Sequence, residues 1–74
     1  MPLPVVSGAQ AVRAFERAGW VFARQKGSHI ILKKPATFHT LSVPDHDELD
    51  SGTLRSLIRK VGLTVDEFEA FLRS

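Results

Sequence analysis

A lysine–glycine pair, Lys26-Gly27, separates two runs of β-prone residues and limits the possible folds more than any other feature of the sequence. The runs cover residues 20–25 and 29–34. Glycine readily adopts the positive φ angle that tight hairpin turns require, so the two runs are expected to pair as antiparallel strands. His29 would then begin the second strand, where the hydrogen bonds of the ladder would hold its backbone in place.

Alternation along each expected strand assigns its side chains to two faces. In the first strand, Trp20, Phe22 and Arg24 are expected to share one face. A turn at residues 35–37 and a third strand over residues 38–43 would complete an antiparallel meander. In the second strand, the expected faces are His29, Ile31 and Lys33 on one side and Ile30, Leu32 and Lys34 on the other.

Capping signals predict three helices around these strands. Ser7 and Gln10 have the spacing of a capping box, and Gly19 ends the helix that they begin. A second capping box at Thr64 and Glu67 begins a short helix near the C-terminus. Between them, a helix capped by Asp50 or Ser51 carries Leu54, Leu57, Ile58 and Val61 at helical spacing and ends at Gly62.

The predicted order is therefore one helix, three strands, one helix and a short helix. This order indicates an α+β architecture, in which helices pack on one face of a three-stranded antiparallel sheet. With 74 residues, the chain is expected to form one domain over residues 1–74, near the lower size limit for a core that folds independently.

Composition argues against several classes of protein. The chain has no cysteine, and its three histidines lack the spacing of a zinc site, so neither a metal nor another cofactor is expected. No apolar run approaches the roughly 20 residues that cross a bilayer, and the N-terminus lacks the pattern of a signal peptide. A soluble cytoplasmic protein without membrane association is therefore expected.

Charge is segregated along the chain, although the net charge is only +2. Lysines and arginines are frequent between Arg13 and Lys34, where Glu16 is the one acidic residue. Residues 45–50 contain four acidic residues and no lysine or arginine. A basic first half and an acidic loop indicate a surface that can attract a polyanion, although ordinary solvated lysines would give a similar pattern.

A histidine on a rigid strand among cations suits the cleavage of a phosphodiester. An imidazole can act as a general acid or base near neutral pH, and lysine or arginine can stabilise charge that develops on the phosphate. His29 is therefore the candidate catalytic residue, with Arg24, Lys26 and Lys33 as candidate phosphate contacts. Alternatively, His29 could be a structural residue beside the turn, with a side chain that only forms hydrogen bonds with the backbone.

Five short segments of the chain are specific in combination: Gly19-Trp20, Arg24-Gln25-Lys26-Gly27-Ser28-His29, Val43-Pro44-x-His46, Gly52-Thr53-Leu54 and Val61-Gly62-Leu63. Together they resemble the HicA (YcfA-like) toxins, which are small ribonucleases of toxin–antitoxin pairs. The resemblance extends from about Ser7 onward. It implies an αβββα fold like that of double-stranded-RNA-binding domains, and metal-independent cleavage of mRNA for which His29 is essential. It also implies a HicB-type antitoxin that covers the active site.

Other polar and aromatic residues leave alternatives open. His46 could shape the acidic loop or act as a second proton-transfer group, and the neighbouring carboxylates favour the structural role because they would repel phosphate. Ser28 is a possible secondary contact, and His39 is expected to be structural. Trp20 and Phe22 could stack on bases, but they suit core packing better.

A second class of function fits the same fold, because a fold does not determine function. The protein could be a non-catalytic module that binds RNA or a protein partner. The surroundings of His29 distinguish the two hypotheses, since an enzyme needs this side chain exposed beside cations and a binding module could bury it.

Overall fold

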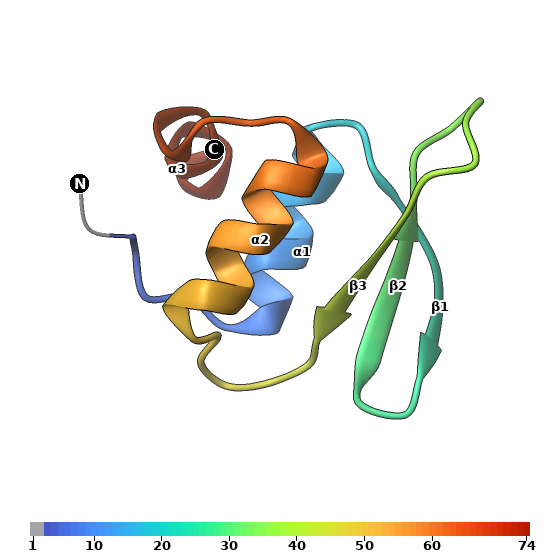
Figure 1. Cartoon of the computed structure of the whole chain (residues 1–74), viewed down its shortest axis with the longest axis horizontal. Helices are drawn as coiled ribbons and strands as arrows, with labels where there is room; N and C mark the ends of the chain where they lie inside the picture. The colour runs from blue at the N-terminus through green and yellow to red at the C-terminus, as the bar shows by residue number, and fades with distance from the viewer. Residues whose placement is uncertain (1–2) are drawn as a thin grey trace.

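The computed structural model describes residues 3–74 of the chain. The strands form one antiparallel sheet in the order β1-β2-β3, and the helices lie on one side of it (Figure 1). The predicted α+β architecture and the predicted order of its elements are confirmed. The elements are α1 (Gly8–Arg17), β1 (Val21–Lys26), β2 (His29–Lys33), β3 (Thr40–Pro44), α2 (Ser51–Val61) and α3 (Val65–Arg73).

The first and last helices begin at the predicted capping boxes. The backbone N–H of Gln10 donates to Ser7 Oγ at 3.1 Å, and the backbone N–H of Ser7 donates to Gln10 Oε1 at 2.8 Å. Thr64 and Glu67 exchange the same two bonds at 3.1 and 2.8 Å. These bonds satisfy backbone donors that the first turn of a helix leaves free, so they fix where α1 and α3 begin.

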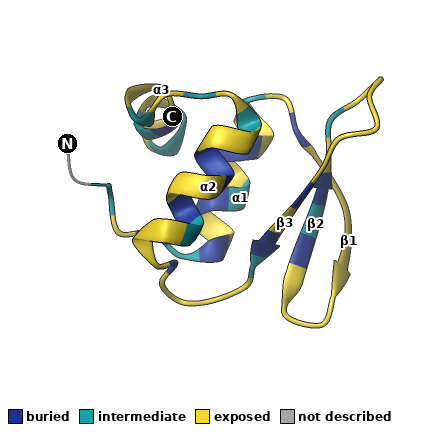
Figure 2. Ribbon diagram, viewed as in Figure 1, coloured by how far each residue is buried: buried dark blue, intermediate teal, exposed yellow. Residues whose placement is uncertain are grey.

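The core lies between the sheet and the helices (Figure 2). Phe15 of α1 and Phe68 of α3 are both fully buried, and their ring centroids lie 5.3 Å apart. Trp20, which precedes β1, is also buried, as expected for a core residue. In contrast, Phe22 leaves about half of its surface exposed, so its predicted role in the core is wrong. The buried strand residues are Ile30, Leu32, Leu41 and Val43.

A β-bulge at Ala23 changes the face to which β1 presents its side chains. Phe22 pairs with Leu32, but the next paired residue is Arg24, which lies opposite Ile31. Directly paired residues project to the same face of an antiparallel sheet. Phe22 therefore lies on the side of the helices, and Arg24 lies on the open side. The prediction that they share a face is wrong, because the extra residue interrupts the alternation.

The third strand begins at Thr40, two residues later than the predicted start at Phe38. The loop before it has its own hydrogen bonds, which compete with strand pairing. Thr37 Oγ1 donates to the carbonyl of Lys34 at 2.9 Å and accepts from the backbone N–H of His39 at 3.1 Å. Ala36 adds a positive φ angle of 64°, which ends the extended conformation.

The start of α1 packs tightly against the segment that follows β3. The backbone N–H of Gly8 donates to the carbonyl of His46 at 2.9 Å. A Cβ atom at Gly8 would overlap the carbonyl oxygen of Pro44, so this close approach requires glycine. Because Pro44 is the strand partner of His29, this packing also sets the backbone beside the histidine.

Replacing Gly8 should therefore destabilise the fold. We expect Gly8→Ala to lower the free energy of unfolding by about 1–3 kcal/mol or more, because backbone atoms must move to admit the methyl group. Gly52→Ala is the matched control in the first turn of α2, where a Cβ would meet Asp50 Oδ2 at 3.5 Å, an ordinary contact. The control should be neutral or stabilising by up to about 1 kcal/mol. Denaturant unfolding measures both variants, and equal effects would contradict the proposed packing.

Candidate active site

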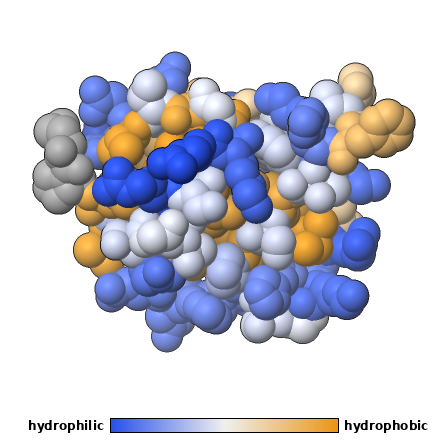
Figure 3. Space-filling view, viewed as in Figure 1, coloured by the Kyte–Doolittle hydropathy of each residue, from blue (hydrophilic) through white to orange (hydrophobic). Residues whose placement is uncertain are grey.

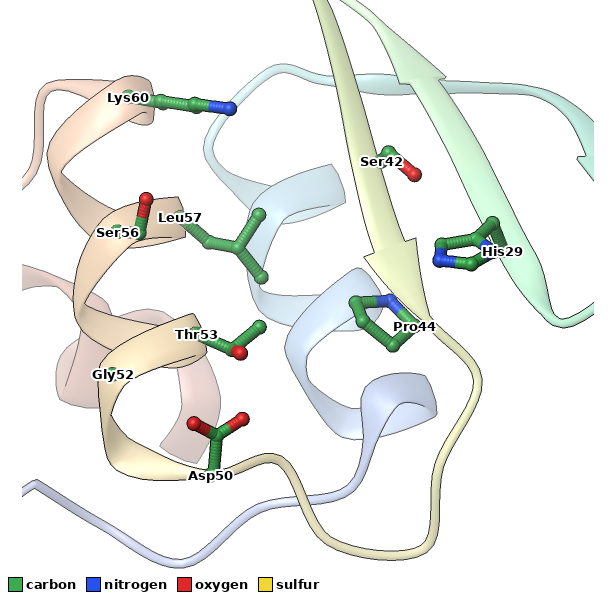
Figure 4. A pocket seen from close by; sticks show the side chains of 9 residues that line it. All are labelled: His29, Ser42, Pro44, Asp50, Gly52, Thr53, Ser56, Leu57 and Lys60. Atoms are coloured by element: carbon green, nitrogen blue, oxygen red, sulfur yellow. The ribbon is translucent and has the colours of Figure 1, made fainter.

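His29 lines an open groove between the sheet and α2 (Figure 4). The histidine is the first residue of β2, is exposed, and lies directly opposite Pro44 of β3. The volume of the groove is about 470 Å³. Its lining residues are His29, Ser42 and Pro44 from the sheet, and Asp50, Gly52, Thr53, Ser56, Leu57 and Lys60 at the start of α2 and along it.

Hydrogen bonds join the β1–β2 turn to the acidic segment after β3. The backbone N–H of Asp45 donates to the carbonyl of Ser28 at 2.7 Å. Gln25 Nε2 donates to Asp45 Oδ2 and to the carbonyl of Gly27, both at 3.2 Å. These bonds flank His29, whose position therefore depends on the turn, on both neighbouring strands and on the acidic segment. Ser28 takes part through its backbone.

The register of the sheet places the predicted phosphate contacts relative to His29. Lys26 lies directly opposite His29, and Arg24 lies opposite Ile31, so both share the open face with the histidine. Lys33 is on the same face but at the far end of β2, about 13 Å from His29 at the rise of an extended strand. Lys26 and Arg24 therefore share the face of the sheet that carries His29, but neither lines the groove, and Lys33 lies farther along the same face.

The sequence did not reveal the wall of the groove that α2 provides. Thr53, Ser56 and Lys60 line it, and all three come from a helix about 25–30 residues after His29 in the chain. Their i, i+3, i+7 spacing does predict a common helical face. The spacing could not show that this polar face lies across from the histidine, because that depends on how α2 packs against β3. Lys60 supplies a cation to the groove, and the sequence alone did not predict it as a site residue.

Asp50 gives the groove an electrostatic polarity. The neighbouring Thr53 hydroxyl lowers the pKa of the Asp50 carboxyl below its usual range, so the group is negative at neutral pH. Asp50 is the residue immediately before α2, and Lys60 lies in the last turn of the helix. An anion in the groove is therefore repelled at the Asp50 end and attracted at the Lys60 end.

The second histidine that the sequence analysis considered, His46, is not among the residues that line the groove. The backbone carbonyl of His46 accepts the hydrogen bond from the backbone N–H of Gly8, which holds the start of α1 against this segment. Its imidazole lies close enough to Asp50 to contribute to the lowered pKa of that carboxyl. These contacts favour a role in shaping the loop.

Within residues 3–74, no group of three or more histidine, aspartate or glutamate side chains is arranged to hold a metal ion. No helix in the same part of the chain is both long and apolar enough to cross a membrane.

The fold and the groove together define a small α+β protein with an exposed histidine beside lysines. A family model described as the HicA toxin of bacterial toxin–antitoxin systems matches residues 8–63, which is more than half of the chain. The chain therefore belongs to the HicA toxin family, and the predicted resemblance is confirmed. No curated protein matches its sequence. The last helix, α3, lies beyond the matched segment, yet it supplies the buried Phe68 to the core.

The position of Lys60 generates a prediction about the binding of RNA. Lys60→Ala should weaken the binding of a short single-stranded RNA and reduce the slope of log K against log salt by about 0.7, the value for one lost phosphate contact. Arg59→Ala removes a positive charge from the same helix at a position outside the lining of the groove, and it should change the slope less. Fluorescence titrations at several salt concentrations measure both slopes. A larger effect of Arg59→Ala would contradict this assignment of the cation site.

Proposed function

We propose that the protein is the toxin of a toxin–antitoxin pair and that it cleaves mRNA without a metal ion, with His29 as its catalytic residue. One observation carries this proposal: His29 is exposed in a groove that also contains Lys60, and Lys26 lies directly opposite it in the sheet. An enzyme requires this arrangement, whereas a module that only binds RNA or a partner does not. Membership of the HicA toxin family supports the role as a toxin.

RNA carries its own nucleophile, which is why a site of this kind can be sufficient. The 2′-hydroxyl attacks the adjacent phosphorus, the bond to the 5′-oxygen of the next nucleotide breaks, and a cyclic phosphate forms. The protein must remove the proton of the 2′-hydroxyl, stabilise the extra negative charge at phosphorus and protonate the leaving oxygen. General acid–base catalysis by one imidazole contributes about 10²–10⁴-fold to such a reaction.

The residues around the groove can perform these steps. His29 takes the proton of the 2′-hydroxyl as a neutral imidazole and delivers a proton to the leaving 5′-oxygen as an imidazolium. Lys60 and Lys26 stabilise the charge on the non-bridging oxygens, and the hydroxyls of Ser42 and Ser56 can donate hydrogen bonds to the same oxygens. Asp50 repels the phosphate from its own end and so favours its placement near Lys60.

The same proposal covers the partner and the location. A toxin of this family has an antitoxin, and we propose that a HicB-type antitoxin binds over the groove and blocks access to His29. We further propose that the protein acts in the cytoplasm, where mRNA is available.

Replacing His29 separates chemistry from binding. We expect His29→Ala to lower the rate of cleavage by at least about 10²–10⁴-fold, because a proton-transfer group is lost, and to leave RNA affinity nearly unchanged. Affinity should persist because it comes mainly from cations that neutralise phosphates. Cleavage of an end-labelled mRNA in EDTA, together with a binding titration, measures both quantities.

His46→Ala is the matched control for this experiment, because it removes an imidazole that lies outside the lining of the groove. It should retain most of the activity of the wild type. Activity that survives His29→Ala, or wild-type activity that disappears in EDTA, would refute the mechanism. An equal loss in His46→Ala would instead indicate a mechanism with two histidines.

The antitoxin should recognise the basic surface around the groove. We expect it to present acidic or polar groups to Lys26 and Lys60, because complementary charges accelerate encounter and fix orientation. Lys26→Glu should therefore slow association and reduce its dependence on salt, as measured by stopped-flow fluorescence. Arg13→Glu, on α1, changes charge equally and serves as a control. A structure of the complex with His29 open to solvent would contradict inhibition by direct blockage.

A further inference from the structure

We propose that the β2–β3 loop forms a second subsite for RNA, in which the ring of Phe38 stacks on an unpaired base and Lys33 contacts a neighbouring phosphate. This inference rests on the proposed cleavage of RNA in the His29 groove. It specifies how the strand is held at a distance from the scissile bond, and it assigns a ligand class, a single-stranded nucleobase, to residues that take no part in the chemistry.

Phe38 has no role in the core. Its side chain is fully exposed at the tip of the loop, although burying a phenylalanine would stabilise the fold by about 1.5–3 kcal/mol. The loop nevertheless has a defined conformation. Thr37 bonds to Lys34 and His39 through its hydroxyl, and the backbone N–H of Lys34 donates to the carbonyl of His39 at 3.2 Å. The aromatic ring is thus displayed on an ordered support.

A hollow beside Phe38 offers space for one flat group. Its volume is about 240 Å³, which is below the roughly 300–1,000 Å³ of sites for drug-sized ligands and suits a smaller group such as a nucleobase. In the space-filling view, apolar surface projects at this loop, at the upper right, next to hydrophilic side chains (Figure 3). The hollow is lined by Lys33, Thr37, Phe38, His39 and Thr40.

The charge of this region favours a nucleic acid. Lys33 lines the hollow, and no acidic side chain does so among residues 3–74. The adjacent Lys34 is engaged elsewhere: its Nζ atom lies 3.5 Å from the carbonyl of Ala18 and 5.9 Å from the centroid of the Trp20 ring. An aromatic ring beside a cation is the combination with which proteins bind single-stranded RNA.

The subsite is also continuous with the proposed active site. Lys33 pairs with Thr40, and His29 pairs with Pro44, so both ends of β2 present these residues to the same open face. The distance of about 13 Å between them corresponds to a few nucleotides of an extended strand. One RNA strand can therefore contact the His29 groove and the loop together.

A protein partner is a poorer match for this loop. Core contacts of protein interfaces are continuous apolar patches from which charges are depleted. Here one exposed ring stands beside a lysine, and the other exposed phenylalanine, Phe22, projects to the opposite face of the sheet with Leu32. A single ring beside a cation fits a base and its phosphate.

The test measures the binding of a fluorescent single-stranded oligonucleotide whose 2′-hydroxyls are methylated, so that it cannot be cleaved. Phe38→Ala should raise the Kd by about 5- to 150-fold, the range for one lost base–aromatic stack. Phe38→Trp should keep the affinity, and its additional tryptophan fluorescence should be quenched by the oligonucleotide. Phe22→Ala, the matched control on the other face, should leave the Kd unchanged. With cleavable RNA, Phe38→Ala should raise KM and retain kcat.

The outcomes distinguish this inference from the proposed function. Unchanged RNA affinity of Phe38→Ala, while wild-type protein cleaves RNA, would overturn the subsite and leave the His29 mechanism standing. Weakened binding of the antitoxin with unchanged RNA affinity would reassign the loop to a protein interface and would also overturn the inference. Wild-type protein that neither binds nor cleaves RNA would overturn both proposals. Thermal unfolding of each variant verifies that the fold is retained.

Discussion

The strict alternation of side chains along β2 is the constraint on which the core and the site both depend. Ile30 and Leu32 are buried against the helices, so His29 and Lys33 must project from the other face. A slip of one residue would expose both aliphatic side chains and direct the imidazole and the ammonium group into the core. Because β2 is paired on both sides, the register has little freedom. The burial of two aliphatic side chains thus fixes where the histidine points.

Local patterns predicted the features that depend on neighbouring residues. The capping boxes at Ser7 and Thr64, the Lys26-Gly27 turn and the faces of β2 all follow from short spacings, and the structure has each of them. The bulge at Ala23 has no comparable signal, since nothing in a run of strand-forming residues marks an extra residue. Yet the bulge decides the face of Arg24 and Lys26. Without it, continuous alternation from Phe22 would turn both cations toward the side of the helices.

The residues that line the groove could be predicted only in part, because some of them come from segments that are far apart in the sequence. The sequence predicted that His29 and Lys26 lie side by side, because they are close in the chain and flank the turn of a hairpin. Ser56 and Lys60 reach the groove through the packing of α2 beside β3, which joins segments that are far apart in the chain. Periodicity gives the polar face of a helix but not the surface that it meets. Lys33 is the converse case: it is close to His29 in sequence, but four residues of extended strand separate the two residues along the open face.

β2 buries one face in the core and exposes the other, so the residues that stabilise the fold are separate from those of the candidate site. A core of this size has little stability to spare, and polar groups inside it would require hydrogen-bonding partners. His29, Lys26 and Lys33 are all exposed, so none of them requires such partners or displaces an apolar contact. Substitutions on the open face should therefore have little effect on folding, whereas substitutions at the buried Gly8 or Leu32 should destabilise the fold. Selection can then vary the residues of the open face without destabilising the fold. The exception is the contact between α1 and the Pro44–His46 segment, through which a defect in packing reaches the backbone beside the histidine.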